Sequence, residues 1–177
     1  LFNGEKSFPV SQKKEITSQV PSLLKKYLKH NDYKEQTIND IFDSKDLKNT
    51  IELNVTNCSS SILWNNQSQK FTLENLSVEG QFSPIYAALF HDFNNDEKFD
   101  IIIGGNQYRA KPQTGIYAAS HGTVYQNINN GRFKALKSKE SGIFIKGEIR
   151  DIKKIEIGDI EHILVSTSNG NLKCYAL

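Results

Sequence analysis

The sequence contains no run of eighteen apolar residues, so we expect no segment that spans a membrane. It has only two cysteines, Cys58 and Cys174, and these lack the spacing of a zinc site or a redox motif. The two thiols either form one disulfide between distant strands or stay unpaired. Methionine is absent altogether and no signal peptide opens the chain, so we interpret the sequence as a fragment, a processed product or a trimmed chain.

An excess of charge of one sign is also lacking, because 22 Lys and Arg face 20 Asp and Glu, for a net charge of +2. Phosphate binding normally needs clustered, unopposed basic residues, so this balance gives no argument for nucleic acid. No glycine-rich phosphate-binding motif occurs. The four histidines have no neighbouring Ser or Cys in a recognisable nucleophile setting, so we expect no catalysis. The 37% hydrophobic and 24% charged content predicts an ordinary globular protein.

The clearest chemical motif is the segment 92–100, DFNNDEKFD, which lies between the apolar runs 85–90 and 101–103. Its oxygen-bearing side chains fall at the first, third, fifth and ninth positions, a spacing that suits a hard cation and favours calcium over magnesium as the cofactor. The predicted ligands are four side chains and one backbone carbonyl, that of Lys98: Asp92, Asn94, Asp96, Lys98 and Asp100. The alternative is a polar hairpin turn whose side chains bond their own backbone.

This motif differs from an EF-hand at two positions. The twelfth residue is Ile103 rather than Glu, and strand-like runs flank the loop where an EF-hand has helices. The sixth residue is Glu97, where a sharp turn usually needs glycine. We therefore expect the loop to be strained or open at Glu97, and its affinity for calcium to be weak.

Three regions follow from the hydrophobic pattern. We assign residues 1–10 to the end of an upstream strand and turn, 11–49 to a helical insertion, and 50–177 to β-structure. Within the insertion, Ser11 is the expected N-cap, and Pro21 predicts two short helices or one kinked helix. Helical turns are expected over 34–42, and residues 43–50 then lead the chain back to strands. The lysine-rich face of the insertion either is solvated or contacts an acidic partner or an anionic membrane surface.

The β region divides into three groups of strands. Alternating apolar residues predict a half-buried strand over 51–56, and hairpins are predicted for 61–64 with 70–73 and for 122–126 with 132–136. The final group comprises 147–157, 161–168 and 172–176. The fold class is therefore mainly β, with about three blade-like units and a short helical insertion near the N-terminus.

Several of these segments resemble one family. Residues 83–87, 92–96 and 103–106 resemble an FG-GAP/VCBS repeat, and the likeness continues through Lys111-Pro112, Gly115, Tyr117, Ala119-Ser120, Gly122, Ser141-Gly142 and 146–153. The order of segments is similar to the C-terminal part of large bacterial VCBS-repeat proteins of the kind associated with an ASPIC/UnbV domain. The resemblance implies terminal blades of a β-propeller. Because propellers need about four to eight blades to close, the implied partner is the remainder of a larger propeller or another protein chain.

The resemblance also implies a function and a location. It suggests a non-catalytic calcium-binding module of an extracellular or bacterial cell-surface protein, which binds protein or glycan or helps to assemble a surface complex. An alternative is a polysaccharide-acting hydrolase or lyase with its site on the propeller face.

An irregular segment over 106–121 is the best candidate for a recognition surface, because loops on a rigid β scaffold often carry binding residues. Its candidate ligand-binding residues are Asn106, Tyr108, Arg109, Lys111, Tyr117 and His121. The adjacent Gly104 and Gly105 would allow a close backbone approach. The alternative is a loop packed on its own tyrosines. Ile116 and Ala118 stand where the family pattern has polar residues, which argues against an inherited polar site.

Overall fold

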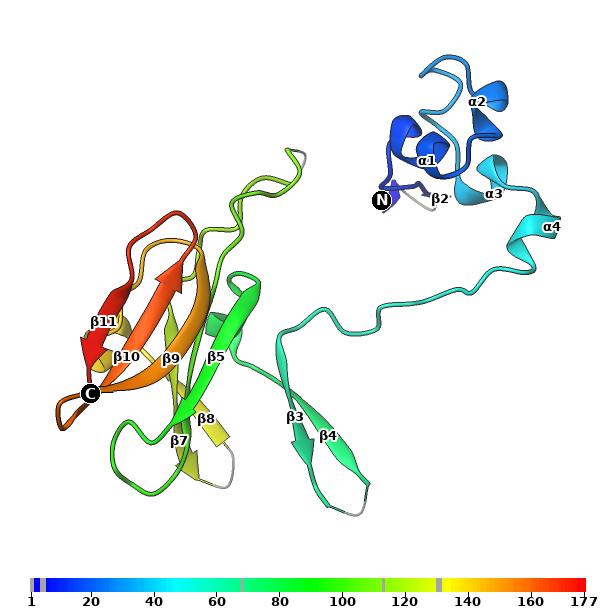
Figure 1. The fold of residues 1–177 in the computed structure, drawn as a ribbon. Coiled ribbons are helices and arrows are strands. Elements are labelled where there is room, and N and C mark those ends of the chain that lie inside the picture. Colours follow the sequence, from blue (N-terminus) through cyan, green and yellow to red (C-terminus); the bar gives the residue numbers. More distant parts are fainter. Residues whose placement is uncertain (1, 4–5, 68, 113, 130–131) are drawn as a thin grey trace. The chain divides into compact units, whose positions relative to one another are not determined.

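A computed structural model describes residues 2–3, 6–67, 69–112, 114–129 and 132–177. The chain divides into two compact units, Leu1–Thr56 and Asn57–Leu177 (Figure 1). The predicted turns that include Ser68 and Asn130-Gly131 fall partly outside the described residues.

The N-terminal unit contains a short β-hairpin and four short helices. Their bounds are β1 (Phe2–Asn3), β2 (Lys6–Ser7), α1 (Lys13–Gln19), α2 (Leu23–Lys26), α3 (Ile38–Ile41) and α4 (Ser44–Leu47). The prediction of two short helices around Pro21 is confirmed, although the N-cap of α1 is Gln12 rather than Ser11. A small core of Leu23, Tyr27 and Ile41 holds these helices together.

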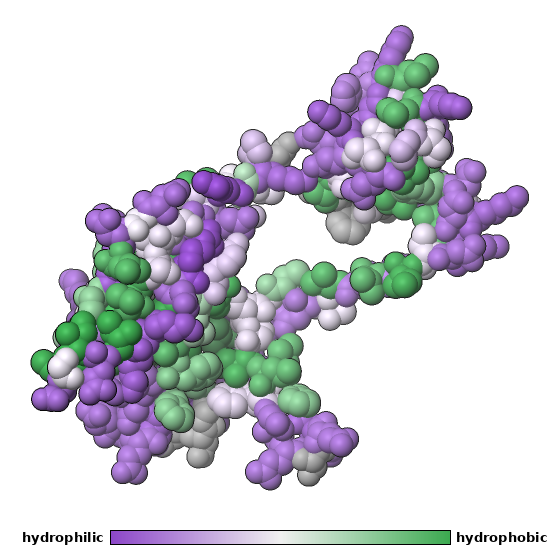
Figure 2. Space-filling model, in the orientation of Figure 1, coloured by the Kyte–Doolittle hydropathy of each residue, from purple (hydrophilic) through white to green (hydrophobic). Residues whose placement is uncertain are grey.

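Helix α4 lies within the predicted helical insertion 11–49, and Asp43 is its N-cap. The prediction of a strand after it is wrong. Residues 51–56 form no strand, and the side chains of Ile51, Leu53 and Val55 are 79 to 87% exposed. Figure 2 shows hydrophobic residues along this extended segment. Alternation alone does not make a strand, since the backbone groups also need a partner strand. The described chain supplies none for this segment.

The C-terminal unit is built from three antiparallel sheets. The first is the hairpin of β3 (Ser61–Asn65) and β4 (Phe71–Asn75), which leads into the 3-10 helix η1 (Val78–Gln81). The second has the order β5 (Ile85–His91), β6 (Asp100–Gly105), β7 (Thr123–Asn129), β8 (Arg132–Leu136) and is followed by α5 (Ser138–Ser141). The third has the order β11 (Lys173–Ala176), β10 (Ile160–Thr167), β9 (Ile149–Ile157).

The two central strands of the four-stranded sheet, β6 and β7, are packed on both faces, because successive side chains of a strand point to opposite sides. Ile102 and Val124 face the larger core, which they share with Ile163 of β10 and other apolar residues of the third sheet. Ile101 and Tyr125 face a second core, which the β3–β4 hairpin covers. Every residue of the central strand β6 is therefore buried, and its first residue is the predicted ligand Asp100.

The predicted close approach at the end of β6 is present. A Cβ atom added to Gly105 would lie 1.7 Å from the carbonyl oxygen of Pro84, and one added to Gly104 would lie 2.6 Å from Cδ1 of Ile149. Both contacts are shorter than any side chain tolerates, so glycine is required for β6 to pack beside β5 and β9.

The fold is mainly β, with several antiparallel sheets, none of which closes on itself among the described residues. The hairpins predicted near 61–75, 122–136 and 147–176 are confirmed, with ends shifted by a few residues. Cys58 and Cys174 are exposed and do not pair with each other. Among the described residues, no helix combines the length and apolar content that crossing a membrane would require.

Candidate metal centre

The predicted ligands lie in the loop between β5 and β6, whose ends are paired at His91 and Asp100. The backbone must reverse within eight residues, and it does so with left-handed conformations at Asn95 (φ 57°) and Glu97 (φ 65°). Asparagine tolerates this conformation, whereas it costs glutamate about 1 kcal/mol or more. The observed backbone is therefore strained at Glu97, the sixth position of the loop, as the sequence predicts.

Asp92 organises the loop through both of its carboxylate oxygens. Oδ1 accepts the backbone N–H of Asp96 at 3.1 Å, and Oδ2 accepts that of Glu97 at 2.7 Å. Partial desolvation acts to raise the pKa of the Asp92 carboxyl, but the backbone N–H donors, led by those of Asp96 and Glu97, outweigh it and hold this pKa below its ordinary value. Asp92 is therefore kept ionised at neutral pH.

Asn94 and Asp96 complete the turn. The Oδ1 atom of Asn94 accepts the N–H of Asp96 at 3.2 Å, and its Nδ2 donates to Oδ2 of Asp96 at 3.1 Å. The other oxygen of Asp96 accepts the N–H of Lys98 at 3.0 Å, and the Lys98 ammonium lies 3.8 Å from Oδ2 of Asp96. The loop thus places a cation from its own chain beside one of its carboxylates.

Asp100 has different surroundings, because its side chain is buried with only 1% exposed. Oδ2 accepts the N–H of Phe93 at 3.2 Å, and Oδ1 accepts the N–H of Asn127 at 2.8 Å. The Asn127 side chain donates in turn to the carbonyl of Phe99 at 3.3 Å. Asp100 therefore extends the β6–β7 ladder by one step and ties the 92–100 loop to β7.

Asn127 was not identified from the sequence. Its Oδ1 is buried and has no hydrogen-bond partner among the described residues. An isolated Asn in a strand carries no distinctive pattern, so only its place opposite Asp100 could have drawn attention to it.

The donor atoms fit a hard cation in part. Asp92, Asn94 and Asp96 present side-chain oxygens on one turn, and each carboxylate oxygen keeps a second lone pair after accepting one N–H. Asp100 differs from these residues because it is buried, with only 1% exposed, and no group of three or more Asp, Glu, His or Cys side chains is arranged around one point within the described residues. The loop therefore resembles a site held by its own backbone, in which Asp92, Asn94 and Asp96 are the accessible donors.

His91 precedes this loop and packs against it. Its ring meets that of Phe93 edge to face at 5.2 Å, and its Nε2 lies 3.1 Å from Oε2 of Glu161 on β10. Glu161 also accepts a hydrogen bond from Lys154 at 2.5 Å. These contacts join the end of β5 to the β9–β10 hairpin.

The segment 106–121 is anchored by a buried amide. Asn106 is 1% exposed, and its side chain donates to the carbonyls of Ser120 and Gly147 and accepts the N–H of Ser120. It thus fixes the two ends of the segment to each other and to the chain before β9. Its contacts are all internal, which sets it apart from the exposed residues that were predicted with it.

The other predicted binding residues lie nearer the surface. Tyr108 and Tyr117 are about 40% exposed. Tyr117 pairs with Gln107 in an isolated β-bridge, and Tyr108 follows Gln107 in the chain. His121 stacks on Phe144, with ring centroids 4.5 Å apart. Arg109 and Lys111 are exposed. Ligand binding by these residues stays a prediction.

An ion pair between a buried glutamate and a half-buried arginine lies beside this segment and was not identified from the sequence. Glu148 is 5% exposed and accepts hydrogen bonds from Arg150 at 2.7 Å and from the N–H of Tyr108 at 2.6 Å. Arg150 also bonds Ser168 and lies over the Tyr86 ring at 4.2 Å. Residues two apart in a strand share one face, so the spacing of Glu148 and Arg150 was the feature of the sequence that could have identified this pair.

Comparisons with models of protein families, with curated proteins and with solved structures find no match for this chain. The resemblance to FG-GAP/VCBS repeats therefore rests on the segments named from the sequence.

Proposed function

We propose that the chain is a non-catalytic, calcium-binding β module whose metal loop braces the end of its four-stranded sheet. In this proposal it forms terminal blades of an FG-GAP/VCBS-type propeller in a secreted or bacterial cell-surface protein. The rest of that propeller, or another chain, supplies the missing blades. The module then serves to bind protein or glycan, or to assemble a surface complex.

The observation that carries the calcium proposal is the arrangement of Asp92, Asn94 and Asp96 on one exposed turn. Their oxygens are held within one hydrogen-bonded network by the N–H groups of Asp96, Glu97 and Lys98. Negative charges held this close repel one another. Bound calcium would supply the positive charge that offsets this repulsion.

Asp92 and Asp96 hold the turn in shape while Asp100 ties it to β7. Binding at the turn would therefore stabilise the β5–β6–β7 sheet as well as the loop. With a dissociation constant on the order of 10⁻⁴ M, as in extracellular calcium modules, about 1 mM calcium would add about 1.4 kcal/mol to the free energy of unfolding.

The test is a thermal melt of the full chain in chelator and in about 1 mM calcium, at concentrations typical of extracellular sites. We expect calcium to raise the melting temperature of the parent chain by roughly 3–8 °C and to leave Asp96→Ala unchanged. Asp151→Ala removes an exposed carboxylate of β9 that lies outside this loop, and should keep the full response.

The calcium proposal is contradicted if the parent shows no shift, or if Asp96→Ala responds as the parent does. An equal response to magnesium would show general charge screening of the loop, because magnesium needs a tighter octahedral site.

A further inference from the structure

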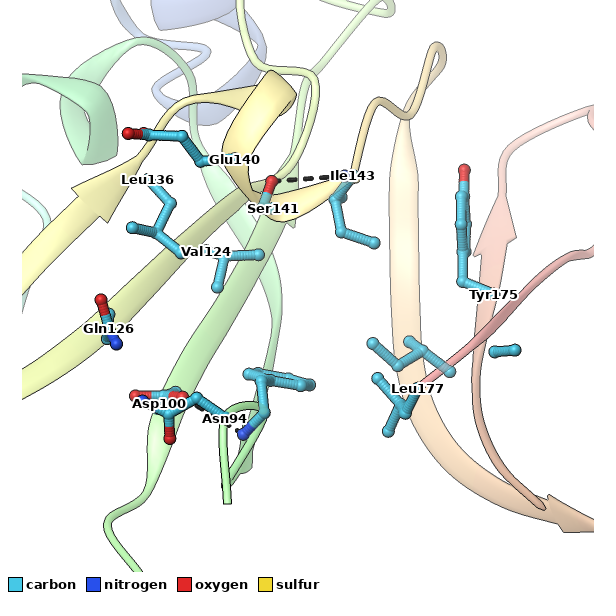
Figure 3. Close-up of a pocket in the computed structure, with 13 residues that line it drawn as sticks. Asn94, Asp100, Val124, Gln126, Leu136, Glu140, Ser141, Ile143, Tyr175 and Leu177 are labelled. Carbon is cyan, nitrogen blue, oxygen red and sulfur yellow. Dashed lines mark hydrogen bonds between the residues drawn. The ribbon is translucent and has the colours of Figure 1, made fainter. Parts of the chain in front are cut away.

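A second feature of the C-terminal unit lies beside the metal loop but does not depend on it. A cavity of about 320 Å³ opens between the four-stranded sheet and the third sheet. Figure 3 shows α5 at one end of it, Asn94 and Asp100 at the other, and Tyr175 and Leu177 across from Val124. Its volume is near the lower end of the range for small-molecule sites.

The floor of the cavity is apolar and well buried. Val124, Ile143 and Ile163 line it and are 1 to 7% exposed. Because these residues belong to the larger core of the unit, the floor is held in place by packing on both sheets. The cavity is therefore a formed feature of the fold, and a compact apolar group would fill it at the expense of water.

Polar groups stand above this floor. Gln126 lies two residues beyond Val124 on β7 and so faces the same side of the sheet, and its carboxamide has no hydrogen-bond partner among the described residues. Ser141 accepts the N–H of Ile143 at 3.3 Å, which leaves its own hydroxyl hydrogen available. A ligand with one hydrogen-bonding group would satisfy the Gln126 carboxamide.

The charge of the lining sets the class of ligand. Asp100 and Glu140 contribute carboxylates, and no Lys, Arg or His is among the described residues that line the cavity. An anion placed there would meet negative charge with no cation to pair it. A neutral ligand that donates a hydrogen bond meets no such penalty.

We propose that this cavity is a binding site for a compact apolar molecule that carries a hydroxyl or amino donor, and that it excludes carboxylates. The apolar body lies on Val124, Ile143 and Ile163, and the donor group faces the oxygen of the Gln126 carboxamide. The proposal needs no bound metal, although Asn94 and Asp100 belong both to the lining of this cavity and to the predicted calcium ligands.

The test is an NMR titration of the full chain with benzyl alcohol as the probe and benzoate as its anionic match, both in chelator. We expect saturable shifts in the amide signals of Val124, Gln126 and Ile143, with a dissociation constant on the order of 1 mM for a probe of this size. Benzoate should bind at least about tenfold more weakly, because it places a charge beside the carboxylates of Asp100 and Glu140 with no cation among the described lining residues.

Two variants locate the binding. Val124→Phe fills the cavity and should abolish the shifts. Gln126→Leu keeps a side chain of similar length but removes the polar partner, and should weaken benzyl alcohol by about threefold to tenfold. Gln19→Leu makes the same change in the N-terminal unit and should have no effect.

The proposal is overturned if benzyl alcohol gives no saturable shift up to roughly ten times the expected dissociation constant. It is also overturned if benzoate binds equally well or if Gln126→Leu binds as the parent does. Because the titration is run in chelator, none of these results bears on calcium binding.

Discussion

Replacing Asp100 by alanine should destabilise the C-terminal unit even when no metal is available. The substitution removes the acceptor for two backbone N–H groups, those of Phe93 and Asn127, from a position that is 1% exposed. A buried donor left without a partner costs about 1–3 kcal/mol, and the 3.2 Å bond is the weaker of the two. We therefore expect a loss of about 2–5 kcal/mol in the free energy of unfolding.

The assay is urea denaturation of the full chain in chelator, followed by the fluorescence of its single tryptophan. Trp64 lies in β3 of the C-terminal unit and stacks on Phe133 of β8, with ring centroids 5.9 Å apart. Its signal therefore reports the packing of this unit. A change in the midpoint without a change in slope would give the loss of stability directly.

Asp96→Ala is the matched control, because it removes an exposed carboxylate from the same loop. Surface changes of this kind usually cost less than about 1 kcal/mol. If Asp100→Ala costs no more than Asp96→Ala, the carboxylate of Asp100 does not hold β6 to β7, and the structural role given to it here is wrong.

Three further predictions concern the same unit. Glu97→Gly should stabilise it by about 0.5–1 kcal/mol in urea denaturation because glycine accepts a φ of 65° without strain, whereas Asn95→Gly should gain less. Carbon NMR should give a pKa for the Asp92 carboxyl in the folded chain that is below its ordinary value. The contribution of this carboxyl to stability is then complete above its pKa in the unfolded chain, and is lost as pH falls through its pKa in the folded chain. Ile163→Ala should cost about 2–5 kcal/mol by the same denaturation assay, whereas Ile116→Ala, at a side chain that is 66% exposed, should cost less than about 1 kcal/mol.

The strands of the C-terminal unit could be predicted because two local signals agree there. Isoleucine and other strand-forming residues are frequent along β9 and β10, and Gly158-Asp159 supplies a turn between them. The same agreement holds for β3 and β4. Where pattern and turn chemistry point to the same pairing, the sequence determines both the strands and their approximate register.

The segment 51–56 shows the limit of this reasoning. Its alternation of Ile51, Leu53 and Val55 is more regular than the apolar pattern of β9 and β10, yet these side chains are exposed. Periodicity describes which side chains would share a face, but it says nothing about whether another strand is present to accept the backbone hydrogen bonds.

The candidate site was predictable to a similar degree. The spacing of Asp92, Asn94 and Asp96 placed them on one turn, as the structure has them. The burial of Asp100 and Asn106 could not be predicted, because it depends on β7 and on the chain before β9, which are distant in sequence.

The shape of the 92–100 loop bears on how it would bind a cation. Asp92 and Asp96 accept the backbone N–H groups of Asp96, Glu97 and Lys98, so the turn is formed by contacts within the chain. A cation that binds such a turn does not have to order it, which favours affinity. The same oxygens are, however, shared with N–H donors, and the Lys98 ammonium lies 3.8 Å from Asp96 and must give way. The Lys98 ammonium is an unfavourable effect that one substitution can remove. Lys98→Gln should therefore raise the calcium affinity of the loop while leaving its fold unchanged.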